Sequence, residues 1–507
     1  MKNQLRSGVY LSYINLAISS LIPFLYTPIM LDMLGQSEYG LYSLANSVVG
    51  YLSLLSFGFG STIVRYLSKY RAENKTKELE ATYGFFLLLY GLLSVVVFVG
   101  GIILSGNVNA IFSAGLKGEE LSKMQVLVII IAFNTAFSFP MSVFSSVAIA
   151  YERYLFRKIL DIISTVAAPV LNLIALYFGF ASVGMALAST ALQIIMAPIS
   201  IIYCFKVIKI RPRFKKLKSS LIKEMIGFSV FVFIGTIVDM LFWATDKVIL
   251  GMLASSVAVA VYNVGGTFNS IVQNLSTSIS GVLIPKITGM VATNSNKSEW
   301  TSLFIRIGRI QFLIIGLIIS GFSVFGQSFI KLWAGNEYAD AYLVTVLTMF
   351  PLCIPLIQNT GLSFITAQNK HKFRAVVYLI IAIVNVASTY LIVPYMGIVG
   401  AALCTCVSYL LGQGVIMNIY YYKVTGLDIP LFWKNILKMA VIPVSLLIIG
   451  IILNRFILID NWFTFLLGVA LYTGVYSVLM YLFAMNDYEK DIIRKPLKKV
   501  LRVFKRG

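Results

Sequence analysis

The stretch TYGFFLLLYGLLSVVVFVGGIILS, residues 82–105, contains no charged side chain. It exceeds the roughly 20 apolar residues that an α-helix needs to cross a bilayer. Backbone groups inside hydrocarbon must be hydrogen-bonded within the protein, so only helices and closed barrels span membranes. An apolar run this long, without the alternation of a barrel strand, predicts a transmembrane helix.

Similar runs recur along all 507 residues, of which 59% are hydrophobic and only 12% are charged. A soluble domain is typically about 25% charged. The sequence therefore predicts an all-α polytopic membrane protein with fourteen transmembrane helices. We expect these spans near residues 9–34, 41–64, 82–105, 123–149, 159–179, 183–204, 225–250, 258–284, 303–327, 342–367, 375–394, 399–420, 435–455 and 462–484.

Lys and Arg alternate between the loops, which predicts the orientation of the chain. With the N-terminus on the cytoplasmic side, most of the 41 basic residues fall in cytoplasmic segments, of which 206–224 (KVIKIRPRFKKLKSSLIKE) is the longest basic connector. The opposite loops then contain only Lys117, Lys331 and Arg455. Basic loops stay inside, so both termini are predicted to be cytoplasmic. The net charge of +21 fits binding to anionic membrane lipids, and no nucleic-acid partner is expected.

The sequence indicates no metal, cofactor or catalytic site. Cys204, Cys353, Cys404 and Cys406 all lie in apolar spans, and His371 is the sole histidine. The HExxH, GxSxG, Walker A and dinucleotide-binding motifs are missing. We therefore expect a protein that is not an enzyme. With no nucleotide-binding loop, the energy for transport must come from a gradient, from the membrane potential or from consumption of the product.

An internal repeat divides the chain. AYERYLFR (150–157) matches AQNKHKFR (367–374), and SVGMALAS (182–189) resembles IVGAALCT (398–405). Spans one to six therefore repeat as spans seven to twelve, in the same orientation. Such a parallel repeat is typical of transporters whose lobes are related by a pseudo-twofold axis along the membrane normal.

The repeat predicts the domain organisation and favours alternating access, in which a cavity between the lobes opens to either side in turn. The alternative is a duplication that merely enlarges a scaffold. The expected parts are an N-lobe at 1–205, a basic cytoplasmic linker at 206–224, a C-lobe at 225–422, two additional spans at 423–486 and a basic amphipathic cytoplasmic tail at 487–507.

Polar residues inside the spans are candidates for the transport site, because a charge at the centre of a membrane helix costs about 2.5–3.5 kcal/mol on insertion scales. Span seven contains Asp239, Trp243, Asp246 and Lys247. Asp239, Trp243 and Asp246 share one helical face by their spacing. This face is either a cavity wall with an ion-coupling carboxylate, Asp239 or Asp246, or part of an Asp–Lys pair that holds helices together.

Three further groups of polar residues are candidates for the same cavity. Asn263, Thr267, Ser270, Asn274 and Ser278 form a stripe on span eight, which either lines a hydrated cavity or bonds to neighbouring helices. In span ten, Pro351 and Pro355 are expected to bend the helix near Gln358 and Asn359. Arg65, Arg306 and Arg309 lie near the cytoplasmic surface, where they either snorkel or together bind a phosphate head group.

Three motifs connect the chain to a known family. LGQSEYGLYSL (34–44), FGFGSTIVRYLSKY (57–70) and TDKVILG (245–251) resemble the polysaccharide-transport branch of the multidrug/oligosaccharidyl-lipid/polysaccharide (MOP) exporter superfamily, which includes the Wzx-type oligosaccharide flippases. The fourteen spans, the six-plus-six repeat and the extra final pair are similar to this superfamily over nearly the whole chain. When these motifs are matched to the family, Arg65 and the Asp246–Lys247 pair fall at positions that belong to the family's motifs.

The resemblance implies a multi-pass protein of the bacterial plasma membrane. Such a protein flips an undecaprenyl-pyrophosphate-linked oligosaccharide to the outer leaflet for O-antigen, capsule or exopolysaccharide synthesis. A polysaccharide polymerase and export machinery are further expected partners, and a coupling ion, Na⁺ or H⁺, is implied if the empty cavity must return against the membrane potential.

Other functions stay open at this stage. Within the superfamily they are a cation-coupled drug antiporter and a lipid II flippase. A membrane glycosyltransferase, polymerase or ligase would need a large outside loop, whereas the largest here is near 106–122. A purely structural membrane scaffold is the remaining alternative.

Overall fold

Helices account for nearly all of the regular structure. The computed structural model describes residues 18–19, 21–215, 217–281, 283–293, 296–368, 370–456, 459–492 and 494, and within these ranges no strand occurs. The prediction of an all-α protein is therefore confirmed. The start of the expected span 9–34 and the tail after Pro496 lie outside the described residues.

The expected number of fourteen transmembrane spans is not confirmed by the described helices. Ten described helices are long and apolar enough to cross a membrane, or up to twelve if each of two bent pairs counts as one span. A shorter apolar helix covers Leu21–Leu34. Two expected spans, 375–394 and 399–420, lie in one segment, Lys372–Thr425, in which Gly397 has non-helical backbone angles. Fourteen spans therefore stays a prediction.

The chain divides into two compact units, which we describe separately: Met1–Asn263 with Ala382–Ala401, and Val264–Ile381 with Ala402–Gly507. Helices α11 (Ser256–Gly281) and α16 (His371–Tyr409) each contribute to both units. The six-plus-six division expected from the repeat stays a prediction.

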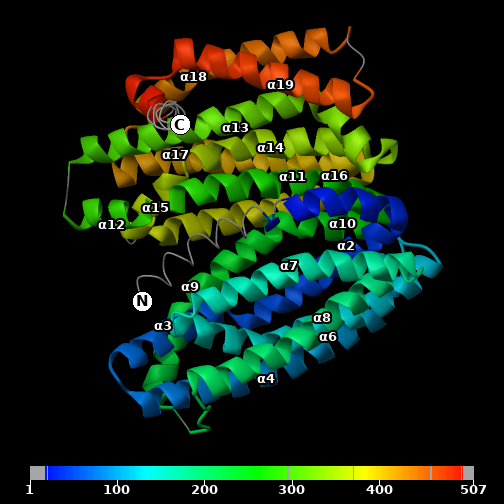
Figure 1. Ribbon diagram of the computed structural model, residues 1–507, viewed down its shortest axis with the longest axis vertical. Helices are drawn as coiled ribbons and strands as arrows, with labels where there is room; N and C mark the ends of the chain where they lie inside the picture. Colours follow the sequence, from blue (N-terminus) through cyan, green and yellow to red (C-terminus); the bar gives the residue numbers. More distant parts are fainter. Residues whose placement is uncertain are drawn as a thin grey trace, which may run out of the picture. The chain divides into compact units, whose positions relative to one another are not determined.

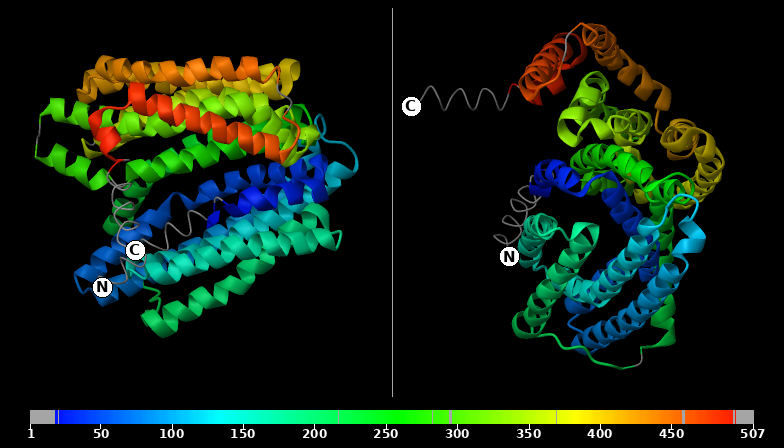
Figure 2. Two further views of the ribbon diagram at one scale, coloured as in Figure 1. Left: turned by 45° about the horizontal axis from the view of Figure 1, so that its top comes forward. Right: turned by 90° about the vertical axis from the view of Figure 1, so that its right-hand side faces the viewer.

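The first unit is arranged around α6, which contacts α2, α3, α4, α7 and α8. In every view α4 lies along α6 (Figures 1 and 2). An aromatic core that includes Tyr66, Tyr83, Phe86 and Phe144 joins α3, α4 and α6. The helices are α2 (Gln36–Gly50), α3 (Phe59–Ala72), α4 (Thr76–Gly106), α5 (Val108–Phe112), α6 (Glu119–Ala150), α7 (Tyr154–Tyr177), α8 (Ala181–Ile202), α9 (Ser219–Trp243) and α10 (Thr245–Leu253), with a 3-10 turn at Tyr51–Ser56 and a π-helical turn at Tyr203–Ile208.

The second unit is arranged around α13, which contacts α14, α15, α18 and α19 (Figure 1). Its helices are α12 (Ile284–Ala292), α13 (Lys297–Ala334), α14 (Ala341–Ile357), α15 (Asn359–Ala367), α17 (Met417–Tyr420), α18 (Ile429–Leu453) and α19 (Trp462–Leu479), with a 3-10 turn at Asn336–Tyr338 and π-helical turns at Leu410–Ile416, Tyr421–Thr425 and Met480–Ala484.

Two predictions about single helices have different outcomes. Span ten bends as its prolines predict, because α14 and α15 meet at 45° with the break at Gln358. Span seven is not the continuous helix expected at 225–250. It is interrupted at Ala244, between α9 and α10, where no proline or glycine marks the break.

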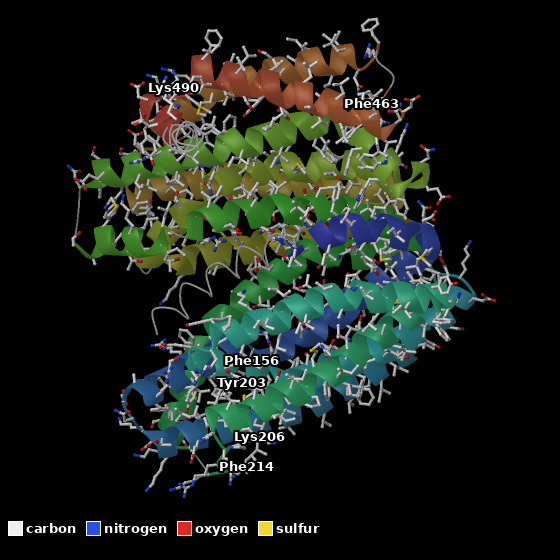
Figure 3. All side chains as sticks on the ribbon, viewed as in Figure 1. Phe156, Tyr203, Lys206, Phe214, Phe463 and Lys490 are labelled. Carbon is white, nitrogen blue, oxygen red and sulfur yellow. The ribbon has the colours of Figure 1, made fainter. Side chains whose placement is uncertain are left out.

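Large apolar side chains cover the outer surfaces of the helices. Phe463 at the start of α19 is 76% exposed, and the sticks of Figure 3 show it pointing away from the ribbon. Exposed apolar surface of this extent indicates contact with lipid. The chain is therefore a multi-pass membrane protein.

A buried ion pair fastens the C-terminal segment to α13. Arg309 donates from Nε to Oε1 of Glu489 at 2.6 Å and from Nη2 to Oε2 at 2.8 Å. Nη2 also donates to the carbonyl of Ala484 at 2.8 Å. Both side chains are buried. Removing one partner of a buried pair typically costs about 3–5 kcal/mol, because the other charge is left without compensation.

We expect Glu489→Gln to lower the free energy of unfolding by about 3 kcal/mol and to lower the melting temperature of the detergent-purified protein. Asp487→Asn is the control, because Asp487 is an exposed carboxylate on the same turn. Equal melting temperatures for the two variants would contradict a stabilising role for the Arg309–Glu489 pair.

Candidate functional site

The TDKVILG motif forms most of the short helix α10, and its carboxylate is deeply buried. Asp246 is 1% exposed. Its Oδ2 accepts a hydrogen bond from the hydroxyl of Tyr262 at 2.5 Å, and its Oδ1 accepts one from Thr389 at 3.4 Å. On the preceding residue, the Thr245 hydroxyl is hydrogen-bonded to Tyr51. Three segments far apart in sequence therefore supply hydroxyl groups around this motif.

The adjacent lysine lies in a separate set of contacts. Lys247 is partly buried, and its Nζ donates to Oδ1 of Asn263 at 3.2 Å. Asn263 in turn donates from Nδ2 to the Tyr39 hydroxyl at 2.6 Å and to Ser43 at 3.1 Å. An ammonium group has three donors. Among the residues that the structure describes, Asn263 supplies the one acceptor recorded for Nζ.

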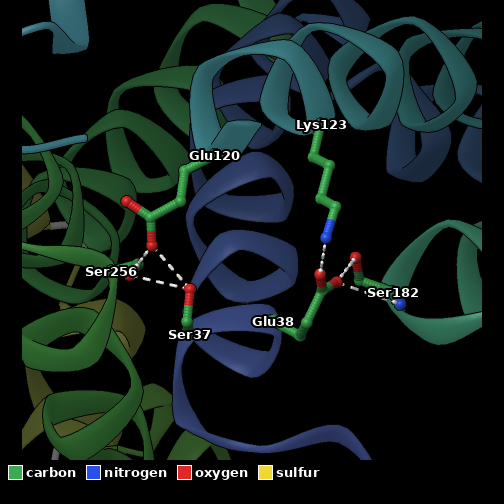
Figure 4. A network of polar contacts seen from close by, with 6 residues as sticks. All are labelled: Ser37, Glu38, Glu120, Lys123, Ser182 and Ser256. Carbon is green, nitrogen blue, oxygen red and sulfur yellow. Dashed lines mark hydrogen bonds and ion pairs between the residues drawn. The ribbon is translucent and has the colours of Figure 1, made fainter. Parts of the chain in front are cut away.

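The polar side chains of Gln36–Gly40, just after the break at Gly35, connect α2 to three other helices (Figure 4). Ser37 donates to Oε1 of Glu120 at 2.5 Å, and Ser256 donates to the same oxygen at 2.6 Å. Glu38 accepts from Lys123 at 2.5 Å and from the hydroxyl of Ser182. Residues of α6, α8 and α11 are thereby held on the first turn of α2.

Gly40 permits the closest of these approaches. A Cβ atom at this position would lie 1.9 Å from the backbone oxygen of Ser256. No side chain fits there without displacing α11. This glycine lets α2 approach α11 closely enough for Ser37 and Tyr39 to reach Ser256 and Asn263, respectively. The contact between α2 and α11 therefore determines where Lys247 finds its acceptor.

The other candidates of span seven and span two lie in more open surroundings. Asp239 on α9 is exposed, whereas Asp246 beyond the break at Ala244 is buried, and Trp243 is partly buried. A continuous helix would have placed the two carboxylates on one face. The break at Ala244 instead gives them different environments. Arg65 on α3 is exposed, and its guanidinium carbon lies 4.5 Å from the centre of the Phe228 ring.

The polar stripe of α11 has two kinds of environment. Asn263 is engaged with Lys247, Tyr39 and Ser43, as described above. Ser270, Asn274 and Ser278 are exposed, and Thr267 is partly buried. Ser278 donates to the carbonyl of Asn274 at 2.7 Å. A different face of the helix bonds within the second unit: the Asn269 amide donates to Thr348 at 2.6 Å, and Ser276 donates to the carbonyl of Leu356 at 3.0 Å.

The remaining candidates lie in the second unit. Gln358 is 1% exposed and donates to Asn418 at 2.7 Å, so it fixes the bend between α14 and α15. Asn359 beside it is partly buried. Arg309 is engaged by Glu489, so we leave it out of the proposed transport site. Arg306 lies with its guanidinium carbon 3.1 Å from the centre of the Tyr488 ring.

Several residues of this site were not singled out in the sequence. Ser37, Glu38 and Tyr39 belong to a recognised motif but were given no role, and Glu120, Lys123 and Ser256 lie in or near loops. Acidic and basic residues that flank apolar spans are usual at membrane surfaces. The one usable signal was the concentration of polar residues around a glycine in QSEYG.

Comparison with known proteins places the chain in a family. Residues 5–291 match the family model described as polysaccharide biosynthesis protein. The chain belongs to this family. It is 21% identical over 400 residues to a putative O-antigen transporter of Shigella flexneri, covering 76% of this chain and 90% of the relative. It is also 20% identical to an uncharacterized membrane protein of Bacillus subtilis, covering 93% and 94% of the two chains.

Solved structures show the same fold. The lipid II flippase MurJ, in an inward closed conformation, superposes with a TM-score of 0.74 at 15% identity, covering 96% of this chain and 99% of that one. An inward-facing multidrug resistance MATE family transporter of the MOP superfamily gives a TM-score of 0.60 at 14% identity, covering 82% and 99%. The resemblance to the polysaccharide-transport branch of this superfamily is therefore confirmed, and the fold is that of its transporters.

Two glycines provide a matched test of the α2–α11 contact. We expect Gly40→Ala to lower the melting temperature, because its methyl group would displace the Ser256 carbonyl. Gly60→Ala meets no atom within 4 Å and lies within a helix, where alanine is favoured over glycine by about 1 kcal/mol. It should leave the melting temperature unchanged or raise it. A Gly40→Ala protein as stable as wild type would show that α2 and α11 are not in close contact.

Proposed function

We propose that this protein flips an undecaprenyl-pyrophosphate-linked oligosaccharide from the cytoplasmic to the outer leaflet of a bacterial plasma membrane. The product would supply O-antigen, capsule or exopolysaccharide synthesis. Family membership, the relative named a putative O-antigen transporter and the fold shared with a lipid II flippase support this proposal. The mechanism we propose is alternating access between two lobes, without an enzymatic step.

The observation that carries the proposal is the environment of Lys247. Its ammonium has donors to spare beyond the bond to Asn263, and a pyrophosphate offers oxygen acceptors of opposite charge. Asp246 has the hydroxyl groups of Tyr262 and Thr389 as partners of its own. Lys247 is therefore the base that we assign to the pyrophosphate.

The exposed stripe of α11 is suited to the sugar portion. Ser270, Asn274 and Ser278 present hydroxyl and amide groups, which both donate and accept hydrogen bonds. Sugar hydroxyl groups also donate and accept, so they can pair with these side chains. We propose that this stripe contacts the oligosaccharide.

The direction of transport follows from charge. Moving one charge across 100 mV is worth about 2.3 kcal/mol, so the two negative charges of a pyrophosphate diester favour movement out of a cell whose interior is negative. The positive charge of Lys247 opposes part of this gain while the loaded site opens outward, and its return without substrate is favoured by the same potential. A coupling cation, Na⁺ or H⁺, that enters during the return would add to the driving force, and Asp239 is the better placed carrier because its carboxylate is exposed.

A drug antiporter and a lipid II flippase of the same superfamily are the alternatives, since MATE transporters and MurJ share this fold. Deletion of the gene should abolish surface polysaccharide while lipid-linked repeat units still form. Normal surface polymer combined with impaired drug export would identify the antiporter. Loss of peptidoglycan synthesis would identify the lipid II flippase.

We expect Lys247→Gln to reduce surface polysaccharide at least tenfold in a deletion strain, because it removes a charge-assisted hydrogen bond worth about 1.5–3 kcal/mol. Lys434→Gln, which neutralises an exposed lysine of α18, is the control. Both proteins should be present at equal levels in the membrane. Full complementation by Lys247→Gln would exclude this lysine as the pyrophosphate base.

The coupling carboxylate is tested separately. Asp239→Asn should change the dependence of flipping on the Na⁺ or H⁺ gradient in reconstituted vesicles, and Asp246→Asn serves as the comparison at the buried position. If both variants flip at the wild-type rate with the same ion dependence, neither carboxylate carries a coupling ion.

The proposed orientation also has a direct test. We expect a cysteine at Lys215, in the basic loop before α9, to react with a membrane-impermeant maleimide only after the cells are opened. A cysteine at Ser113, in the turn after α5, should react in intact cells. The reverse pattern would invert the topology.

A further inference from the structure

A polar cavity lies in the second unit, between the first turns of α13, the start of α18 and the segment after α19. Its volume is about 660 Å³. The residues that matter for its chemistry are Lys297, Arg306, Asp428, Asn435 and Tyr488. None of them takes part in the Lys247 site.

The cavity has an excess of positive charge. Arg309 also lines it, but Glu489 neutralises that guanidinium. Among the described residues, the lining then has two uncompensated basic side chains, Lys297 and Arg306, and one carboxylate, Asp428. One oxygen of Asp428 is occupied at the N-terminus of α18, where it accepts from the backbone N–H of Leu431 at 2.9 Å. An anion is the ligand that would balance these charges.

The Arg306 side chain is held in place, but one of its hydrogen-bond donors lacks a recorded acceptor among the described residues. Its guanidinium stacks on Tyr488, which fixes the plane of the group. Its Nε is buried, and among the described residues no acceptor is recorded for it. A buried donor without an acceptor costs about 1–3 kcal/mol, and more when it is charged. An oxygen of a bound phosphate would remove this cost, because guanidinium and phosphate form bidentate pairs.

An apolar groove lies beside the next turns of the same two helices, α13 and α18. It has a volume of about 350 Å³. Its α13 side begins at Phe312, one turn beyond Arg309, and extends to Ser323; its α18 side includes Leu437, Ala440 and Leu447. Residues 312–323 span roughly 17 Å of helix. This length is close to the hydrocarbon depth of one leaflet, about half of 30 Å.

We propose that this pair of cavities binds an anionic phospholipid of the surrounding leaflet, with its phosphate on Arg306 and Lys297 and one acyl chain in the groove. The length of the groove favours a chain of leaflet depth over a polyprenyl chain, which would extend far beyond it. The two cavities share no lining residue with the side chains assigned to flipping, so the inference does not depend on the proposed function.

The test uses the full-length protein purified in detergent, with bound lipid counted by native mass spectrometry. The probes are phosphatidylglycerol, zwitterionic phosphatidylcholine and soluble glycerol phosphate. Arg306→Gln removes the phosphate contact, and Ala440→Phe fills the groove. Arg374→Gln is the matched control, because Arg374 also stacks on a tyrosine, Tyr378 at 4.4 Å, away from the cavity. Melting temperatures without lipid establish that each variant is folded.

We expect wild type and Arg374→Gln to retain phosphatidylglycerol in preference to phosphatidylcholine. Arg306→Gln should bind phosphatidylglycerol about tenfold more weakly, the loss of one charge-assisted contact. Ala440→Phe should lose the lipid but keep whatever affinity wild type has for glycerol phosphate.

Three results would overturn the proposal. They are equal retention of phosphatidylglycerol by Arg306→Gln and wild type, equal retention of the two lipids by wild type, and unchanged lipid binding by Ala440→Phe. The last result would show that only the phosphate of the lipid is recognised and that the groove holds no acyl chain. If Arg306→Gln does not fold, the wild-type lipid preference and the Ala440→Phe comparison still decide the question.

Discussion

The close contact between Gly40 and the Ser256 carbonyl is the constraint on which the contacts around Lys247 depend. Only a residue without a side chain lets α2 and α11 approach this closely. The approach brings Ser37 and Ser256 to the same oxygen of Glu120. It also brings Tyr39 and Ser43 to Asn263, whose amide oxygen accepts from Lys247. A glycine on another helix therefore positions the acceptor of the partly buried Lys247 ammonium.

The polar interior follows from the solvent in which the protein folds. Hydrocarbon offers no hydrogen bonds, so a charged group on a spanning helix requires partners from the protein. Glu38 accepts hydrogen bonds from a lysine and a serine, and Asp246 accepts from two hydroxyl groups. Arg309 donates to a carboxylate and to a backbone carbonyl. Each set joins helices that are distant in sequence. These bonds add less to the net stability than their number suggests, but they specify which helices are neighbours, because any other pairing would leave a charge in lipid.

Hydropathy predicted the helices well because crossing a bilayer is a requirement on composition alone. The run at 82–105 lies inside α4, and the two prolines of α14 precede the observed bend. The break at Ala244 was missed because no residue type marks it, and it gives Asp239 and Asp246 different surroundings. Asp246, Lys247 and Asn263 were chosen because they are polar residues within spans, but their partners Tyr39, Tyr262 and Thr389 depend on tertiary packing. The partner of Arg309 lies 180 residues further along the chain, where no local pattern could identify it.

The same contacts constrain how a substrate held by Lys247 would leave. Lys247 precedes the turn at Ala254–Ser255 by about two helical turns, or roughly 10 Å, and the bonds among Ser37, Glu120 and Ser256 lie just beyond that turn. In the proposed orientation this turn faces outward, so these bonds lie between the lysine and the outer surface. Outward release then requires α2 and α11 to separate at Gly40, with Glu120 exchanging its hydroxyl partners for water. A contact made of neutral hydroxyl and amide groups and one partly buried carboxylate can be opened at modest cost, whereas breaking a buried ion pair such as Arg309–Glu489 would cost about 3–5 kcal/mol. We therefore infer that the movable contact is the one that Ser37, Gly40 and Glu120 make with Ser256. The ion pairs, including Glu38–Lys123, belong to the parts that stay intact.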